Sequence, residues 1–437
     1  MAGLFKINDS LANKISYYHL MALLASLPFD LFYSHLILIS YIIHTLIHLK
    51  KENIKPIFNT RVLALQSVFL LTVCSTFYSY NKPQAFSEWG KDLTILVFPI
   101  IFCLNPLDIG KYKPKLLQAF GWVCTATVVY LYADAFKTIR HYHLPLAAIF
   151  SNAFTNHNFA EPIAMHATFF SMQLMVALAS LLTFVINEKN TIARLSNFFC
   201  CMILTGGIIQ LGSKSILFTL LIMINVVLPW FLLQGRARLR SIIASAALTF
   251  LAGGAILASP VFRDRLITGL KADLAIQTVG ETYDSRLTRW ETTLELIKKK
   301  PMIGYGAGTE ISLLQDSFYR KKMYDSYLQR LNGHSEYLSI ALKSGIIGLL
   351  VYLATLALGF KKSINKKDVP FFVFMLVIAL VSVSENLLDV DKGTFFYAFF
   401  FSFFMFLVEK KREKPVAGLR QLEIGVPKEE ILVEVSI

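Results

Sequence analysis

The segment that decides the fold reads DSRLTRW at residues 284–290, PMIGYGAG at 301–308 and NGHSEYL at 332–338. It lies between two blocks of long apolar runs and collects nearly all the side chains of this chain that can do chemistry. A polar segment enclosed by apolar runs of membrane-spanning length belongs at one face of a bilayer. The rest of the chain is then the scaffold that holds this segment there.

The composition indicates a protein that crosses a membrane many times. The chain has 437 residues, of which 55% are hydrophobic and 16% charged, and its mean hydropathy is +0.54. Soluble domains carry about 25% charged residues, so a soluble core could not absorb this much apolar sequence. We predict an all-α polytopic membrane bundle of about twelve transmembrane helices, with a large periplasmic loop that contains amphipathic helices. The apolar runs lie roughly at 16–30, 32–48, 60–79, 92–104, 116–135, 161–186, 195–211, 215–234, 241–258, 335–358, 369–386 and 394–408.

The basic residues favour an orientation with both chain ends in the cytoplasm. Alternating connections assigned to the cytoplasm hold 24 Lys and Arg, whereas the other side holds 7 outside the long connection 259–333. Basic residues accumulate in cytoplasmic loops, so this alternation predicts an even number of spans. The predicted parts are an N-terminal membrane bundle of about nine spans at 1–258, a periplasmic loop at 259–333, about three further spans at 334–408 and a cytoplasmic tail at 409–437.

The predicted periplasmic loop departs from this charge bias. It carries twelve Lys and Arg against nine Asp and Glu on the side where basic residues are scarce. Long loops translocate largely regardless of charge, so tolerance is one interpretation. The other is a surface that is kept basic because it meets an anion.

Several common activities find no support in the sequence. The net charge of +14 is dispersed between the apolar runs, which argues against nucleic-acid binding. The five cysteines lie inside apolar runs without CxxC spacing, so neither disulfides nor a zinc site is indicated. The glycines at 304–308 follow a predicted helix and lack the Lys-Ser/Thr of a P-loop. Asp389 and Asp391 have the DxD spacing of metal-dependent nucleotide-sugar enzymes, but no α/β domain accompanies them. We therefore expect neither a metal nor another cofactor.

Residues 286–300 are predicted to form an amphipathic helix along the outer membrane surface, because their apolar side chains recur at helical spacing. Either Asp284 or Ser285 can cap its start, and Pro301 ends it. Arg286 and Arg289 share a neighbouring face of this helix. A guanidinium stays charged and offers a planar fork to phosphate oxygens. These arginines either face a cavity that holds an anion or serve lipid headgroups.

Two further basic side chains stand at the predicted outer ends of spans. His334 precedes a span, and nearby positive charges would favour its neutral form, which suits a general base on a hydroxyl. An ordinary interfacial histidine fits the same position. Lys214 interrupts two apolar runs at an external turn, where it either faces the bundle interior or snorkels outward. The candidate supporting residues on the same outer side are Tyr337, Glu385, His157 and His166.

The order of these motifs resembles the O-antigen ligase and O-antigen polymerase superfamily of bacterial inner-membrane proteins, and most of all its ligase branch. The residues that carry the resemblance are Lys214 at an external turn, Arg286 with Trp290, Pro301 with Gly304 and Gly306, and His334 with Leu338. The resemblance implies a GT-C-like glycosyltransferase that takes a glycan from a polyprenyl (undecaprenyl) diphosphate carrier and passes it to an acceptor hydroxyl at the periplasmic face.

The resemblance also implies roles for single residues. Arg286 would bind the diphosphate, with Arg289 as a further candidate, and His334 would deprotonate the acceptor. The family usually has arginine where this chain has Lys214, and lysine keeps the charge but loses the bidentate fork. Fixed cations would stabilise the diphosphate leaving group without a metal, and attack opposite that group would invert the anomeric centre.

Several functions stay open within this resemblance. We favour ligation of O-antigen to lipid A-core in lipopolysaccharide biosynthesis. A polysaccharide polymerase or a protein O-oligosaccharyltransferase would use the same donor and similar residues. A polytopic transporter and a non-enzymatic membrane scaffold are the alternatives of other classes. The expected partners are the carrier-linked glycan donor, lipid A-core or another glycan or lipid acceptor, and membrane lipids, but no nucleic acid.

Overall fold

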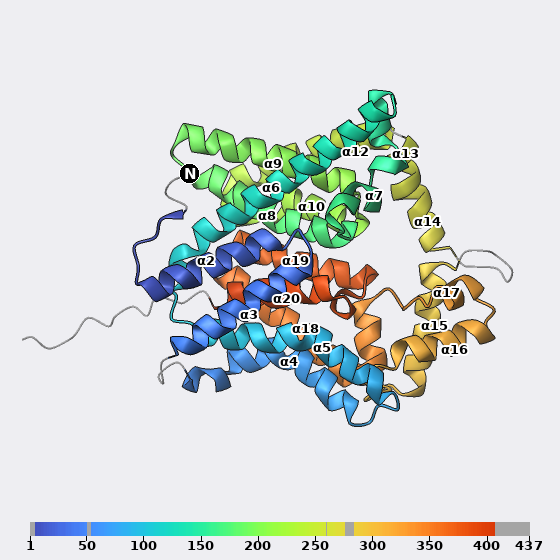
Figure 1. Ribbon diagram of the computed structural model, residues 1–437. Coiled ribbons are helices and arrows are strands. Elements are labelled where there is room, and N and C mark those ends of the chain that lie inside the picture. Colours follow the sequence, from blue (N-terminus) through green and yellow to red (C-terminus); the bar gives the residue numbers. More distant parts are fainter. Residues whose placement is uncertain (1–4, 50–53, 259, 276–283, 407–437) are drawn as a thin grey trace, which may run out of the picture. The chain divides into compact units, whose positions relative to one another are not determined.

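The fold is described by a computed structural model for residues 5–49, 54–258, 260–275 and 284–406 (Figure 1). All regular secondary structure of these residues is helical, as the sequence predicts. The predicted tail at 409–437 lies outside the described residues. Every predicted apolar run coincides with a helix. These helices are α2 (Leu11–Ser26), α3 (Leu31–Ile47), α4 (Thr60–Thr76), α5 (Lys82–Leu104), α6 (Ile109–His141), α8 (Ala167–Asn187), α9 (Thr191–Leu211), α10 (Lys214–Ile222) continued through a π-turn by α11 (Leu228–Leu232), α12 (Gly235–Ala258), α18 (Glu336–Asn365), α19 (Val369–Ser384) and α20 (Asp391–Met405).

Five helical segments are long and apolar enough to cross a membrane, namely α6, α8, α9, the continuous α10–α11 segment and α18. The shorter helices α3, α4 and α19 are apolar as well. Large side chains of α12 such as Leu248, Phe250 and Leu251 are exposed, as expected of a helix that faces lipid. The chain is thus a multi-pass membrane protein. The count of about twelve spans stays a prediction.

The core of the bundle is built around α8 and α20. Every side chain of α8 from Ala167 to Leu181 is buried, and so is every one of α20 from Gly393 to Met405. The helix α8 packs against α6, α9 and α19, whereas α20 packs against α5. Helices in lipid associate through close van der Waals contact rather than by the hydrophobic effect. The phenylalanines of α20 supply part of that contact, as where Phe395 and Phe399 pack edge-on against Phe98 of α5.

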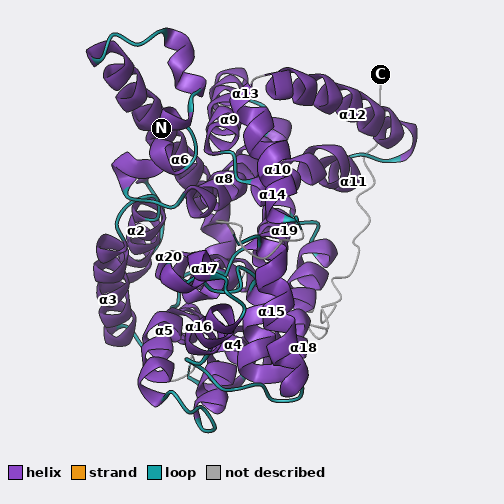
Figure 2. Cartoon of the chain, turned by 90° about the vertical axis from the view of Figure 1, so that its right-hand side faces the viewer, coloured by secondary structure: helices purple, strands orange, loops and turns teal. Residues whose placement is uncertain are grey.

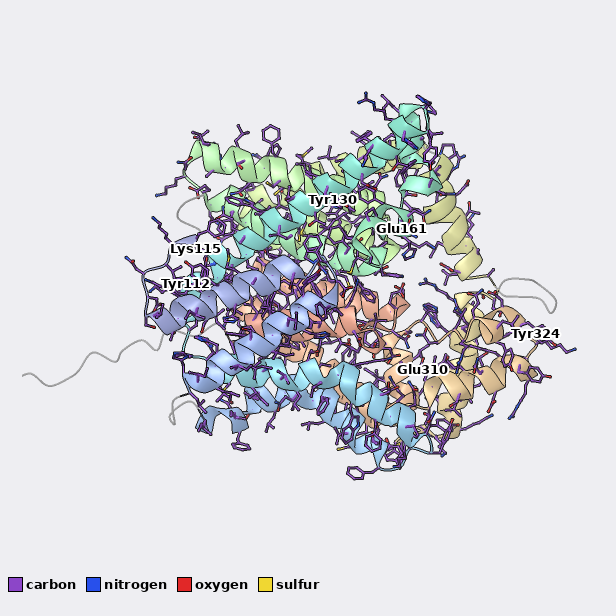
Figure 3. All side chains as sticks on the ribbon, in the orientation of Figure 1. Tyr112, Lys115, Tyr130, Glu161, Glu310 and Tyr324 are labelled. Atoms are coloured by element: carbon purple, nitrogen blue, oxygen red, sulfur yellow. The ribbon has the colours of Figure 1, made fainter. Side chains whose placement is uncertain are left out.

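The two ends of the bundle carry different chemistry. At one end the first turn of α6 meets the start of α19, where Lys113 pairs with Asp368. The side chain of Tyr112 lies at this end, and those of Glu161 and Glu310 lie at the other (Figure 3). The basic cluster at the start of α6, which the sequence assigns to the cytoplasm, is therefore distant from the polar segment around residue 310.

Short helices gather at the second end. Figure 2 looks at this end, where α15, α16 and α17 lie in front of the bundle. Hydrogen bonds fasten the connection between α15 and α16 to the turn between α4 and α5. The Ser79 hydroxyl donates to the Ala307 carbonyl at 2.7 Å, and the Asn81 amide donates to the Gly308 carbonyl at 3.1 Å. These short elements are η3 (Leu146–Phe150), η4 (Asn152–Phe154), α7 (His157–Ala160), η5 (Glu161–Ile163), α13 (Pro260–Arg263), η7 (Asp264–Thr268), α14 (Gly269–Asp273), α15 (Arg286–Lys299), α16 (Glu310–Arg320), α17 (Tyr324–Leu328) and η8 (Leu387–Asp389). The short helix η2 (Lys55–Phe58) instead lies between α3 and α4.

A kink in α18 receives the glycine-rich connection 301–308. Gly345 has φ 66° and interrupts the helix, which leaves backbone groups on both sides without helical partners. The connection supplies these partners: the Tyr305 N–H donates to the Leu342 carbonyl at 2.9 Å, and the Pro301 carbonyl accepts from the Ile346 N–H at 2.8 Å. The glycines at 304–308 therefore serve close backbone contact with a broken helix, which the sequence did not predict.

Candidate functional site

The start of α15 is fixed by Ser285. Its hydroxyl accepts from the Thr288 N–H at 3.2 Å, so Ser285 is the N-cap. Asp284, the other candidate, instead accepts from the Ser326 N–H at 2.7 Å. Arg286 is consequently the first helical residue. A cation at a helix N-terminus opposes the helix dipole, so an anion nearby is needed to stabilise it there.

Two carboxylates provide that negative charge, and the first also binds Lys214. Nζ of Lys214, the first residue of α10, lies 2.8 Å from Oδ2 of Asp273. The other oxygen of Asp273 lies 3.7 Å from Nε of Arg286. A single carboxylate at the end of α14 thus links cations from two helices that are far apart in the sequence. Both cationic side chains keep part of their surface exposed.

The second carboxylate, Glu385, connects Arg286 to His334. Its Oε1 lies 3.7 Å from Nη2 of Arg286, and its Oε2 lies 3.6 Å from Nδ1 of His334. Arg286 also donates from Nη1 to the Ser384 carbonyl at 3.0 Å. Burial alone would raise the pKa of Glu385, but the His334 ring and the Arg286 charge outweigh it. The pKa of Glu385 therefore lies below its ordinary value, and the group is ionised at neutral pH.

His334 is held by contacts to its own backbone. Its φ is 47°, in the left-handed region, which costs a residue other than glycine about 1–3 kcal/mol. The His334 N–H donates to the Asn332 side chain at 3.0 Å, and the His334 carbonyl accepts from Nε1 of Trp290 at 3.4 Å. The tryptophan of the Arg-x-x-x-Trp motif therefore links α15 directly to the histidine.

A cavity of about 380 Å³ opens beside the histidine ring. His334 and Glu385 form part of its wall, together with residues that precede α8 and residues around the turn between α19 and α20. Lys214, Arg286 and Asp273 do not line it. His334 therefore has the cationic pair on one side, through Glu385, and an open space on the other.

His166 forms the wall of this cavity at the start of α8. Its Nδ1 accepts from the Thr168 N–H at 3.3 Å, which caps the helix and leaves the proton of the neutral ring on Nε2. The His157 ring lies 4.2 Å away, centroid to centroid, but does not line the cavity. Loss of hydration among the surrounding protein atoms, together with nearby positive groups, lowers the pKa of His166 to about 4. At neutral pH this ring is an uncharged hydrogen-bond donor.

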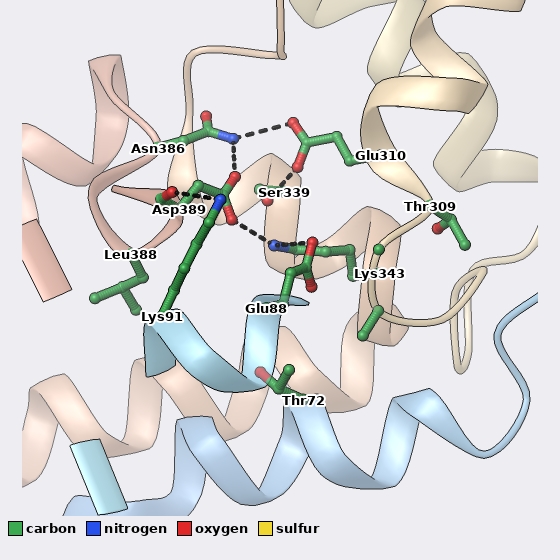
Figure 4. A network of polar contacts seen from close by, with 12 residues as sticks. Thr72, Glu88, Lys91, Thr309, Glu310, Ser339, Lys343, Asn386, Leu388 and Asp389 are labelled. Atoms are coloured by element: carbon green, nitrogen blue, oxygen red, sulfur yellow. Dashed lines mark hydrogen bonds and ion pairs between the residues drawn. The ribbon is translucent and has the colours of Figure 1, made fainter. Parts of the chain in front are cut away.

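A buried polar network supports the site from behind (Figure 4). Glu310, the first residue of α16, accepts from the Gly333 N–H at 3.2 Å and from the Asn386 amide at 3.0 Å. The same amide donates to Asp389 at 2.8 Å, and Nζ of Lys343 binds the other oxygen of Asp389 at 2.8 Å. The network thus fixes the residues directly before His334 and directly after Glu385. The DxD aspartate at 389 is part of this network.

The structure brings only some of the candidate residues together. Lys214, Arg286, Glu385 and His334 form one connected cluster, and His166 reaches the adjoining cavity. Two other candidates lie apart from it: Arg289 is buried within α15, and the Tyr337 hydroxyl donates to the Ala379 carbonyl of α19 at 2.8 Å.

Sequence analysis missed several polar residues of this region, among them Glu310 and Lys343 of the buried network. Asp273 lies in an ordinary charged stretch, and its pairing with Lys214 depends on where α14 ends. Asn386 follows Glu385 directly, so the Ser384-Glu385-Asn386 run was a usable signal. Lys392 lines the cavity, and its only signal was its place among the few basic residues on the predicted outer side.

Fold and site together define a multi-pass helical membrane protein with a cationic and imidazole cluster at one end of its bundle. Residues 199–353, from α9 into α18, match the family model described as O-antigen ligase. This match confirms the resemblance to the O-antigen ligase and polymerase superfamily over these residues. This family implies a membrane glycosyltransferase or ligase activity that acts on glycan and lipid substrates. No curated protein matches the chain.

Proposed function

We propose that the protein is a periplasm-facing glycosyltransferase. It moves a glycan from a polyprenyl diphosphate carrier to an acceptor hydroxyl, and O-antigen ligation to lipid A-core is the function we favour. The observation that carries the proposal is the position of Glu385 between Arg286 and His334. This arrangement places a base close to an anion-binding pair, as a transfer from a diphosphate requires.

The donor diphosphate would bind to Lys214 and Arg286. Asp273 already brings an anionic group within 2.8 Å of one cation and 3.7 Å of the other, so both can share an anion. A bound diphosphate would take the place of this carboxylate. As the bond between the anomeric carbon and the phosphate oxygen breaks, its electron pair passes to the diphosphate. Fixed cations stabilise this charge without having to reorganise.

His334 would accept the proton of the acceptor hydroxyl. A proton on Nδ1, directed toward Glu385, leaves the lone pair on Nε2 for the hydroxyl. The carboxylate then stabilises the imidazolium that forms when the hydroxyl oxygen attacks the anomeric carbon. Because Arg286 and His334 both contact Glu385, the group that would bind the leaving diphosphate and the group that would accept the proton are held at a fixed distance from each other. The reaction needs no metal in this scheme and inverts the anomeric centre.

The side of the membrane that the site faces is inferred from the distribution of basic residues. Basic residues assigned to the cytoplasm lie at the end of the bundle that is formed by the starts of α6 and α19, and the site lies at the other end. Under the positive-inside rule, this arrangement supports a site at the periplasmic face of a bacterial inner membrane, with both termini in the cytoplasm. A polymerase or a protein O-oligosaccharyltransferase would use the same site. A transporter is less favoured, because the polar cluster lies at one end of the helices.

The test is reconstitution of the purified protein with a polyprenyl diphosphate glycan and three acceptors: rough lipopolysaccharide, the carrier-linked glycan itself, and unfolded protein. Mass analysis of the products separates ligase, polymerase and protein glycosylation. We expect His334→Ala and Arg286→Ala to abolish transfer, and Lys214→Ala to lose most of it, while all three variants stay folded. Lys214→Arg should retain activity, since the charge stays. Transfer by His334→Ala at the wild-type rate would refute the base assignment.

A further inference from the structure

The cavity beside His334 contains a cation that the transfer scheme does not use. Lys392, in the first turn of α20, lines the cavity and donates to the Ala164 carbonyl. Within residues 5–49, 54–258, 260–275 and 284–406, no carboxylate lies within ion-pair distance of its ammonium group. The charge of Asp30 acts on Lys392 from beyond that distance, so this half-buried lysine retains the capacity to pair directly with an anion.

The other polar groups of the wall suit a sugar. His166 offers a neutral N–H donor, and Asn332 contributes its side-chain NH2 group, whereas the Asn386 amide is already bound within the buried network. Phe169 and Val390 form an apolar part of the wall, against which the C–H face of a sugar ring can pack. The volume of about 380 Å³ lies within the range of about 300–1,000 Å³ that is usual for small-molecule sites.

The position of the cavity relative to the cations limits which substrate it can receive. In an inverting transfer, the attacking hydroxyl and the leaving group lie on opposite sides of the anomeric carbon. The cations Lys214 and Arg286 lie outside the cavity wall, whereas His334 forms part of it. The acceptor hydroxyl must therefore approach His334 from the cavity.

We propose that this cavity is the acceptor subsite and that it selects an anionic sugar, whose phosphate or carboxylate substituent pairs with Lys392 while its hydroxyl meets His334. The proposal rests on the proposed glycosyl transfer and adds the chemical class of the acceptor. Asn332 and His166 then act as specificity residues for the ring hydroxyls.

Binding is tested apart from transfer. Saturation-transfer NMR with the detergent-solubilised full chain compares hexose 6-phosphate, a hexuronate and the uncharged hexose. We expect at least one of the two anionic sugars to bind more tightly than the hexose, and the stronger of the two identifies the substituent. Lys392→Gln should weaken that binding about tenfold or more, which is the effect of losing one charge-assisted hydrogen bond. Lys392→Arg should retain it.

A matched control is Lys137→Gln, which removes the same charge from an exposed position near the end of α6. It should bind the anionic sugars as the wild type does. Equal binding of charged and uncharged sugars, or unchanged binding by Lys392→Gln, would overturn the subsite. In the transfer assay Lys392→Gln should raise the KM for rough lipopolysaccharide and leave the KM for the donor within twofold. Absence of transfer by the wild type, with selective binding intact, would instead count against the proposed function alone.

Discussion

One carboxylate oxygen of Glu385 faces Arg286 and the other faces His334. The role of this carboxylate can be tested by a substitution that removes only its charge. Glu385→Gln keeps the size of the side chain but no longer stabilises an imidazolium on His334 or neutralises Arg286. General-base catalysis contributes about 10²–10⁴-fold, so we expect kcat to fall by about 10²-fold or more. Steady-state transfer kinetics measure this.

The matched control for that variant is Glu161→Gln. Glu161 is an exposed carboxylate at the same end of the bundle (Figure 3), and its replacement should leave kcat within twofold of the wild type. A Glu385→Gln variant with the kcat of the control would separate this carboxylate from the chemistry.

His166 predicts how stability depends on pH. Its pKa falls from 6.5 to about 4 on folding, so the unfolded chain binds more protons between these values. Stability should therefore rise as pH rises from about 4 to about 6.5, and the contribution of His166 should be constant above that. His166→Asn cannot titrate but keeps a side-chain acceptor for the N-cap of α8.

Thermal unfolding of both proteins in detergent at pH 5 and pH 7.5 checks this prediction. Between pH 7.5 and pH 5, the midpoint temperature of unfolding should fall further for the wild type than for His166→Asn. Comparison within each protein removes the effect of the substitution itself. An equal loss in both would show that His166 does not contribute to the pH dependence.

At the scale of elements, the broken helix α18 depends on Gly345. A Cβ at this residue would lie 2.1 Å from the Met302 carbonyl oxygen, and the φ of 66° disfavours any side chain. Gly345→Ala should therefore destabilise the protein by more than about 1–3 kcal/mol and displace the connection 301–308. The thermal midpoint and the transfer rate should both fall.

The control for this prediction is Gly90→Ala in α5, where a Cβ meets nothing within 4 Å. Alanine favours a helix over glycine, so this variant should be as stable as the wild type or more so. If Gly345→Ala matched it in stability, the kink would not be needed for the fold.

At the scale of the whole molecule, the two ends of the bundle should lie on opposite sides of the membrane. After replacement of the five native cysteines, single cysteines at the exposed positions Leu328 of α17 and Ile192 of α9 test this. A membrane-impermeant maleimide added to intact spheroplasts should label Leu328→Cys and spare Ile192→Cys until the membrane is permeabilised. The reverse pattern would contradict the proposed orientation.

Much of this fold could be predicted because membrane helices leave a strong mark on sequence. Each apolar run coincides with a helix, and Pro301 ends α15 as expected. The kink at Gly345 could not be predicted, because a glycine within an apolar run is compatible with a continuous helix. It becomes a break only where another backbone supplies the missing hydrogen bonds, and that contact joins residues distant in the chain.

The candidate site was predictable to a similar extent. Lys214, His334 and Glu385 were selected at predicted span ends and Arg286 on the predicted amphipathic helix, and the structure brings these four side chains into one cluster. Arg289 and Tyr337 were selected on the same grounds, yet one is buried in its helix and the other binds a backbone carbonyl. Helical spacing defines a face only approximately, and it cannot tell which neighbour that face will meet. Asp273 is the converse case: residue type and position did not select it, yet it pairs with both Lys214 and Arg286.

The backbone hydrogen bonds between residues 301–308 and the kinked helix α18 also limit how such proteins can diversify in evolution. Neither partner can complete its hydrogen bonds alone, so the two segments must be inherited as a unit. A chimaera that imports α15 to α17 from a relative without residues 342–347 would leave unpaired amides and carbonyls against the bilayer. An exchange of α15 to α17 between relatives should therefore give a stable protein only when the crossover points lie outside residues 286–347.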